Sequence, residues 1–173
     1  MLIVFGGLPG TGKTTLSRAL AAEIPATWLR IDQIEAAMWN CGVARDFATG
    51  VAAYGVANAV ADAQLALGRP VIVDAVNPVE AARQGWRDLA ASRGVELRFV
   101  EVVCSDPDLH RRRVTERVSD LAGLTVPTWS DVVDREYEPW TGERLVVDMA
   151  DPVDDCVRAV RAYVGLVGPG PVA

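Results

Sequence analysis

One short stretch near the start of the chain combines the residue types that bind phosphate. It reads Gly7, Leu8, Pro9, Gly10, Thr11, Gly12, Lys13 and Thr14, which is an unbroken match to the pattern G-x-x-x-x-G-K-[ST]. Lys13 is the only lysine of the chain. Its ammonium would reach the β- and γ-phosphates of a nucleotide, and the hydroxyl of Thr14 would ligate Mg²⁺. We expect this stretch, together with the following Thr15, to bind a nucleotide.

A strand before this stretch and a helix after it are needed to position it. Residues 2–5 form a short apolar run, which favours a strand, and Leu16, Ala19 and Leu20 have the spacing of one helix face. The backbone N–H groups of the glycine-rich turn and the positive end of the helix dipole would then converge on an anion.

The rest of the chain alternates strand patterns with helix patterns. Four further strands are predicted at residues 27–31, 70–74, 97–103 and 144–148. Three helices are predicted to begin where a capping residue, Asn77, Asp106 or Asp151, precedes a proline. Alternating strands and helices predict a three-layer α/β fold, with a five-stranded parallel sheet between helices.

The chain reads as a single domain. We expect it to cover residues 1–166, with insertions at about 33–67 and 105–142 that form a lid and an acceptor site. Residues 167–173 contain alternating glycine and proline, which cannot continue a helix, and are expected to be a flexible C-terminal tail.

Two carboxylates lie where predicted strands end, at the edge where open α/β sheets bind ligands. Asp74 follows three β-branched residues and is the expected second Mg²⁺ ligand beside Thr14, although a polar residue that merely ends a strand is the alternative. Asp32 opens the pattern D-x-x-E with Glu35. That pattern is typical of a helix N-cap with a reciprocal glutamate, and Asp32 is equally a candidate catalytic base, so both interpretations stay open.

The densest positive cluster contains Arg111, Arg112, Arg113 and Arg117, after the fourth predicted strand. Arg113 and Arg117 are four residues apart and are expected on one helix face. Such a run is usually a solvated helix face. Beside a phosphate site, however, we expect a lid arginine to reach the transferred phosphoryl group. His110, the only histidine, is predicted to be a surface residue.

Aromatic and arginine side chains occur in both insertions. The first has Trp39, Arg45, Phe47 and Tyr54, and the second has Trp129, Arg135, Tyr137 and Trp140. They either pack the insertions onto the sheet or line an acceptor pocket, and the sequence leaves both possibilities open.

Charge and hydropathy exclude other classes of protein. The net charge of −6 argues against broad contact with nucleic acid, because such proteins carry basic faces. No apolar run approaches the roughly 18 residues that span a bilayer, and residues 1–5 lack the features of a signal peptide. We therefore expect a cytoplasmic protein without a membrane partner. Cys41, Cys104 and Cys156 are far apart and odd in number, so they are predicted to be free thiols.

The chain resembles the small P-loop kinases of the nucleoside-monophosphate-kinase type in four features: the stretch from Gly7 to Thr14, Asp32, residues 73–77, and the pair Arg113 and Arg117. More narrowly, residues 31–38 are similar to a segment of the group that contains chloramphenicol phosphotransferase, the kinase domain of polynucleotide kinase and zeta toxins. The resemblance implies a P-loop NTPase fold with a helical lid and ATP as the donor. It also implies that Asp32 is the general base and that Arg113 and Arg117, with Lys13, neutralise the transferred phosphoryl group.

Two departures narrow this prediction. Nucleoside-monophosphate kinases carry D-G-F-P-R at the third strand, whereas residues 74–78 of this chain read D-A-V-N-P, which argues against a nucleoside monophosphate as acceptor. A GTPase is excluded because its N-K-x-D motif needs a second lysine. The preference for ATP otherwise rests on the resemblance.

The resulting expectation is an ATP- and Mg²⁺-dependent kinase that phosphorylates a hydroxyl of a small molecule, either a metabolite or an antibiotic. One alternative is a nucleic-acid 5′-end kinase, which the acidic balance disfavours. Another is an ATP-binding module that hydrolyses ATP slowly or not at all. The identity of the acceptor and the oligomeric state do not follow from the sequence.

Overall fold

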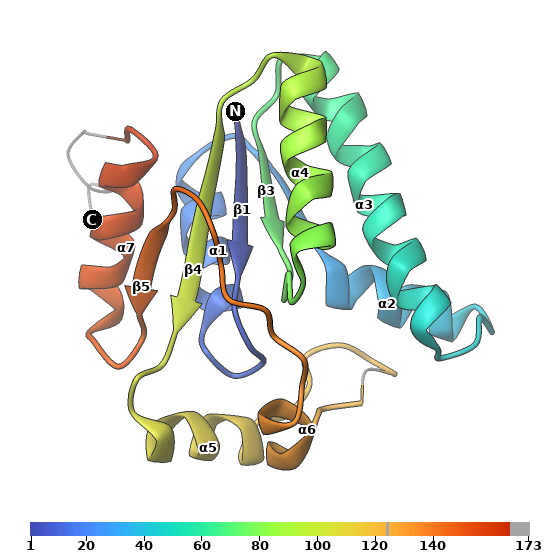
Figure 1. Ribbon diagram of the computed structural model, residues 1–173, viewed down its shortest axis with the longest axis vertical. Helices are drawn as coiled ribbons and strands as arrows, with labels where there is room; N and C mark the ends of the chain where they lie inside the picture. The colour runs from blue at the N-terminus through green and yellow to red at the C-terminus, as the bar shows by residue number, and fades with distance from the viewer. Residues whose placement is uncertain (124, 167–173) are drawn as a thin grey trace.

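The computed structural model describes residues 1–123 and 125–166, and these form a three-layer α/β fold (Figure 1). Within them, one sheet contains the strands β1 (Leu2–Gly6), β2 (Thr27–Arg30), β3 (Val71–Asp74), β4 (Leu97–Val103) and β5 (Leu145–Asp148). Its order is β2-β3-β1-β4-β5, and every neighbouring pair is parallel. The sheet confirms the predicted fold class. The predicted tail, residues 167–173, lies outside the described residues.

Helices cover both faces of this sheet. The described helices are α1 (Lys13–Glu23), α2 (Ile31–Asn40), α3 (Phe47–Ala66), α4 (Glu80–Arg93), α5 (Pro107–Thr115), α6 (Trp129–Val133) and α7 (Val153–Tyr163). Helices α1 and α7 pack together on one face, whereas α3 and α4 pack together on the other. Helices α5 and α6 lie below the carboxyl ends of the strands in Figure 1, where ligands bind in this class of fold.

Alternation along β1 divides the core between the two faces. Leu2 and Val4 pack on the side of α3 and α4, whereas Ile3 and Phe5 pack on the side of α1 and α7. All four side chains are fully buried, as expected for a central strand of a parallel sheet.

One of the three predicted helix caps is confirmed. Asp106 accepts hydrogen bonds from the backbone N–H groups of Asp108 and Leu109 at the start of α5. The prediction for Asp151 is wrong, because Pro152 occupies the N-cap position of α7 and no side chain caps that helix.

The prediction for Asn77 is also wrong, because α4 begins at Glu80. Asn77 instead adopts a left-handed conformation, with φ of 51°, and its buried amide joins β1 to α4. Its Nδ2 donates to the Phe5 carbonyl at 2.9 Å, and its Oδ1 accepts from Trp86 Nε1 at 2.9 Å. These bonds fix the loop that follows β3.

None of the helices in the described part of the chain is both long enough and apolar enough to cross a membrane.

Candidate active site

The predicted phosphate-binding stretch forms a tight loop between β1 and α1. Gly7 has φ of 138°, and a Cβ atom there would clash with the Val102 carbonyl, so only glycine fits. The Leu8 carbonyl accepts from Thr11 Oγ1 at 2.9 Å and from Lys13 Nζ at 2.8 Å. Because α1 begins at Lys13, its first N–H groups, which have no partner within the helix, lie at this loop.

Helix α5 supports the loop from outside. His110 Nε2 lies 2.8 Å from the Pro9 carbonyl oxygen, and the imidazole packs edge-on against Trp129 with the ring centroids 5.2 Å apart. The prediction of a surface histidine is wrong, because these two neighbours leave His110 only 8% exposed. A Cβ atom at Gly10 would clash with Val114 of the same helix, so loop and helix fit closely.

Asp74 ends β3 next to the loop. Its side chain is buried, and this burial raises the pKa of its carboxyl group, against the opposing effects of Lys13 and of a hydrogen bond with Thr14. Its Oδ2 has no hydrogen-bond partner. Burial likewise lowers the pKa of the Lys13 ammonium, against the attraction of Asp74 and Asp32.

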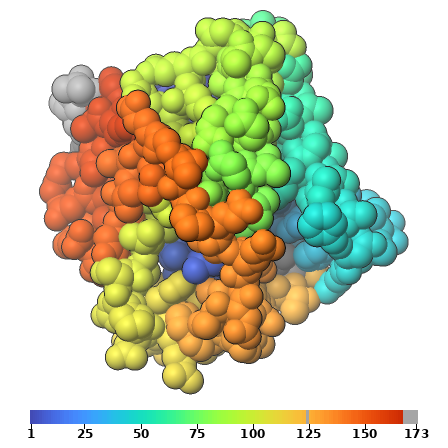
Figure 2. All heavy atoms as spheres, viewed as in Figure 1, coloured from blue at the N-terminus to red at the C-terminus, as the bar shows by residue number. Residues whose placement is uncertain are grey.

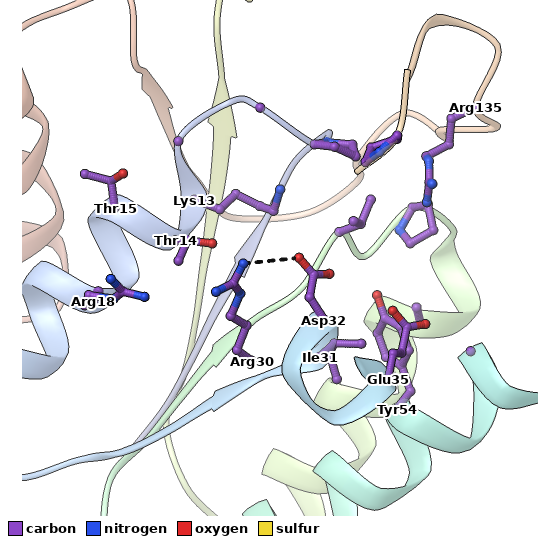
Figure 3. Close-up of a pocket in the computed structure, with 18 of the residues that line it drawn as sticks. Lys13, Thr14, Thr15, Arg18, Arg30, Ile31, Asp32, Glu35, Tyr54 and Arg135 are labelled. Carbon is purple, nitrogen blue, oxygen red and sulfur yellow. Dashed lines mark ion pairs between the residues drawn. The ribbon is translucent and has the colours of Figure 1, made fainter. Parts of the chain in front are cut away.

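Asp32 lies in the first turn of α2 and lines the same cavity as Lys13 (Figure 3). The cap interpretation of Asp32 is wrong, because Arg30 is the N-cap residue and no side chain caps the helix. Asp32 Oδ2 instead lies 3.7 Å from Arg30 Nη2 and 3.9 Å from Arg117 Nη2. Two guanidinium groups therefore flank a carboxylate that is 33% exposed.

Arg30 is a residue that the sequence reasoning missed. It ends β2 with its side chain 2% exposed, and its Nη1 donates to Asp120 Oδ2 at 2.7 Å. Its Nε lies 4.0 Å from Asp74 Oδ2. The one available signal was an arginine between Leu29 and Ile31, at the end of a predicted buried strand. One cation thus faces three carboxylates of the site.

The structure places Arg113 and Arg117 on the cavity wall but not on one helix face. Helix α5 ends at Thr115, so Arg117 follows the helix and the predicted shared face is wrong. Arg113 donates to the Met149 carbonyl at 3.0 Å and so contacts the loop after β5. Arg111 is exposed and does not line the cavity.

A large cavity extends from the loop toward α3. Its volume is about 1420 Å³, and it is bordered by the loop, α2, α3, the start of α4 and the segment after α5. The surface is hollowed near the carboxyl ends of the strands in Figure 2, where blue atoms of the N-terminal part are visible at the bottom of a recess. The cavity is therefore large enough for a nucleotide and a second small molecule.

The aromatic residues of the two insertions divide between the two predicted roles. Trp39, Phe47 and Tyr54, with Arg135, line the cavity. The others pack against the protein instead. Trp129 covers His110, Trp140 packs edge-on against Phe99 with centroids 5.4 Å apart, and Tyr137 Oη accepts from Trp140 Nε1 at 2.6 Å.

Comparisons with known proteins agree with this fold. A model of the family AAA_33, described as an AAA domain, matches residues 2–128. No curated protein matches the chain. Three solved structures illustrate the shared fold. A sugar kinase from Janibacter sp. HTCC2649 is 14% identical with a TM-score of 0.72, covering 96% of this chain and 95% of that chain.

The APS kinase CysC of Mycobacterium tuberculosis, in complex with AMPPNP and APS, is 20% identical with a TM-score of 0.70, over 95% of this chain and 96% of that one. Kti12 of Chaetomium thermophilum, in complex with ADP-AlF3, is 19% identical with a TM-score of 0.70, over 98% and 100% of the two chains. These likenesses show the fold, and they agree with the resemblance to small P-loop kinases. Because the family model spans most of its length, this chain belongs to the AAA_33 family of P-loop domains.

Proposed function

We propose that this protein is an ATP- and Mg²⁺-dependent phosphotransferase that moves the γ-phosphoryl group to a hydroxyl of a small molecule. The place of Asp32 is the observation that supports this most. Its carboxylate is partly exposed to the cavity that Lys13 also lines, and Arg30 and Arg117 hold it there at 3.7 and 3.9 Å. A module that only binds or slowly hydrolyses ATP has no need of a base that faces an acceptor.

In the proposed reaction the acceptor oxygen attacks the γ-phosphorus. A new O–P bond forms while the bond to the β–γ bridging oxygen breaks, and ADP leaves with that electron pair. Asp32 takes the proton of the hydroxyl. The loop amides and Lys13 hold the phosphates, and Arg117 and Arg113 neutralise charge on the transferred group, which is the main contribution a protein makes to this chemistry.

The residues beside the loop fit a divalent cation. Asp74 is buried, its carboxylate has a hydrogen bond with Thr14, and its Oδ2 has no hydrogen-bond partner, with Arg30 Nε 4.0 Å away. A buried carboxylate oxygen without a partner is costly unless a cation or a donor satisfies it. Thr14 and Asp74 would therefore hold Mg²⁺, which when bound neutralises charge on the β- and γ-phosphate oxygens.

Separate incubations of the protein with ATP, Mg²⁺ and hydroxylated metabolites, antibiotics or oligonucleotides test this function. We expect one small-molecule class to gain the mass of one phosphoryl group and to accelerate ADP formation. The same incubations with Asp32→Asn should lose the transfer. Phosphorylated oligonucleotide ends would favour a 5′-end kinase, and ADP formation that no acceptor changes would favour an ATP-binding module.

A further inference from the structure

One wall of the cavity is apolar and continues outward from the reacting end. Helix α3 contributes Phe47, Val51, Tyr54 and Asn58, whose spacing places them on one helix face. Phe47 is 88% exposed and Val51 is 56% exposed, so two large apolar side chains of this face contact water. Singly scattered exposed apolar residues are ordinary, whereas these two are neighbours on one helix face and both line the cavity.

Helix α4 completes this wall, which we call the α3–α4 groove. It contributes Ala81, Ala82, Gly85 and Trp86. Among the described residues that α3 and α4 present to the cavity, none is charged. The groove therefore offers no group that would pair with a phosphate, a sulfate or a carboxylate of an acceptor.

The polar side chains of the groove bond to the protein and leave only the Tyr54 hydroxyl proton and Asn58 Oδ1 to face a ligand. Tyr54 Oη accepts from the Asn77 backbone N–H at 3.0 Å, and Trp86 Nε1 donates to Asn77 Oδ1 at 2.9 Å. Asn58 Nδ2 donates to the Gly85 carbonyl at 3.3 Å. A site that selects a polyol hydrogen-bonds its hydroxyl groups, because those bonds provide the discrimination. The groove presents mainly apolar surface instead.

Two glycines keep the groove open. A Cβ atom at Gly55 or at Gly85 would have no neighbour within 4 Å, so these positions border free space between the helices. At the inner end, Asp32, Glu35 and Tyr54 lie together (Figure 3). The groove thus leads directly from the proposed base to an apolar surface.

We propose, on the basis of the phosphotransferase function, that the acceptor is an alcohol whose body is an aromatic or alicyclic ring. The ring packs in the α3–α4 groove against Phe47 and Val51, and its hydroxyl lies at Asp32. We expect sugars, sugar acids and phosphorylated acceptors to bind more weakly, because the groove itself has no charged side chain, and the charged residues of the cavity, such as Glu35 and Arg135, lie outside it.

Matched acceptors test this proposal. The ring alcohols are 2-naphthylmethanol and cyclohexylmethanol, and the polar ones are glycerol and D-gluconate. Two readouts are taken for each: equilibrium binding in the presence of AMPPNP, and gain of one phosphoryl mass with ATP and Mg²⁺. We expect the ring alcohols to bind and to be phosphorylated, and the polar alcohols to do neither.

Gly85→Leu fills the groove without straining the backbone, because Gly85 is a helical position with open space around it. We expect it to weaken binding of 2-naphthylmethanol by about tenfold or more. Ala91→Leu, on an exposed part of α4 outside the groove, is the matched control and should leave that binding unchanged. Binding of a fluorescent ATP analogue reports whether each variant is folded.

Phe47→Ser removes an exposed wall residue without touching the core and should weaken binding of 2-naphthylmethanol in the same way.

The outcomes separate the two proposals. Binding of 2-naphthylmethanol that Gly85→Leu and Phe47→Ser both weaken, but without transfer, supports the groove and refutes the phosphotransferase. Transfer to D-gluconate without binding of the ring alcohols supports the phosphotransferase and overturns the groove. No binding of the ring alcohols, or binding that neither variant changes, also overturns it.

Discussion

Arg30 Nη1 donates to Asp120 Oδ2 at 2.7 Å and so connects the end of β2 to the segment that follows α5. Arg18 of α1 donates to the same oxygen at 3.2 Å. Because Arg30 also faces Asp32 at 3.7 Å, the proposed lid and the proposed base share one guanidinium. Asp120 and Asp32 therefore contact the same arginine from two sides.

The Arg30–Asp120 contact predicts a specific acid sensitivity. The pKa of the Asp120 carboxyl group is lowered from 3.8 to about 2, and the hydrogen bond from Arg30 is the largest cause. A lowered pKa stabilises the fold above the unfolded pKa, and this stabilisation is lost as the pH falls from about 4 to about 2. Over this window the free energy of unfolding should fall less steeply in Asp120→Asn than in the wild type.

Thermal denaturation at several pH values between these limits measures the difference, which will be small because the Asp120 side chain is 47% exposed. Asp134→Asn is the control, since Asp134 is an exposed acid at the end of α6 and is not part of the Arg30 cluster. Parallel slopes for all three proteins would contradict the role of the contact.

We expect Arg30 to contribute more to the stability of the fold than its exposed partner Asp120. The Arg30 guanidinium and the Asp74 carboxylate are both almost fully buried, so Arg30→Met removes a buried cation and leaves Lys13 as the cation near Asp74. We expect a loss of stability below the roughly 3–5 kcal/mol that is typical when one partner of an isolated buried pair is removed. Arg30→Lys keeps the charge but not the planar fork. We expect chemical denaturation to rank stability as wild type, then Arg30→Lys, then Arg30→Met. Arg30→Lys should also lower kcat while affinity for ATP changes little, and an unchanged kcat would limit Arg30 to a structural role.

The sequence predicted the parts of the fold that depend on local pattern. The five strands were located to within about a residue. Strands of a parallel sheet are buried on both faces, so each is recognisable as a short apolar run without information about the strands beside it. The phosphate-binding loop was recognisable because its backbone conformation requires glycine at Gly7, Gly10 and Gly12.

Features that depend on tertiary contacts were missed or misplaced. The Arg30–Asp120 bond joins residues that are 90 positions apart, and His110 reaches Pro9 across 101 positions. Asn77 resembled a helix cap in sequence, yet its amide forms hydrogen bonds to Phe5 of β1 and Trp86 of α4. In each case the same residue type suits a local role, and only packing decides which role it takes.

The metal prediction concerns Asp74, whose buried Oδ2 has no hydrogen-bond partner. Asp74→Asn removes the negative charge but keeps nearly the same volume. We expect Mg²⁺-dependent turnover to fall strongly, while nucleotide binding in the absence of metal changes little. Titration of turnover with Mg²⁺, beside nucleotide binding in EDTA, measures both. An unchanged Mg²⁺ dependence would leave Asp74 as a structural strand end.

The arginines after β4 should differ in their effects. Arg117 faces Asp32 at 3.9 Å, and a preorganised donor at a transferring group is typically worth about 10²–10³ in rate, so Arg117→Ala should lower kcat by that amount. Arg113→Ala should lower kcat and also the melting temperature, because it loses the bond to the Met149 carbonyl. Arg111→Ala, at an exposed site outside the cavity, should be near neutral. Small and equal effects of all three would assign the cluster to a solvated surface.

Asp32→Asn tests the proposed base most directly. The side chain does not cap α2, so the substitution breaks no cap. What it removes is one negative charge in the first turn of the helix, where the dipole favours it, and the attraction to two arginines. Because the carboxylate is one third exposed, we expect only a small decrease in melting temperature.

The asparagine amide of Asp32→Asn cannot accept the proton of a hydroxyl, so phosphorylation of the acceptor should fall by about 10²–10⁴ at saturating substrates. A rate per folded molecule that equals the wild-type rate, with nucleotide binding intact, would remove Asp32 from the reaction.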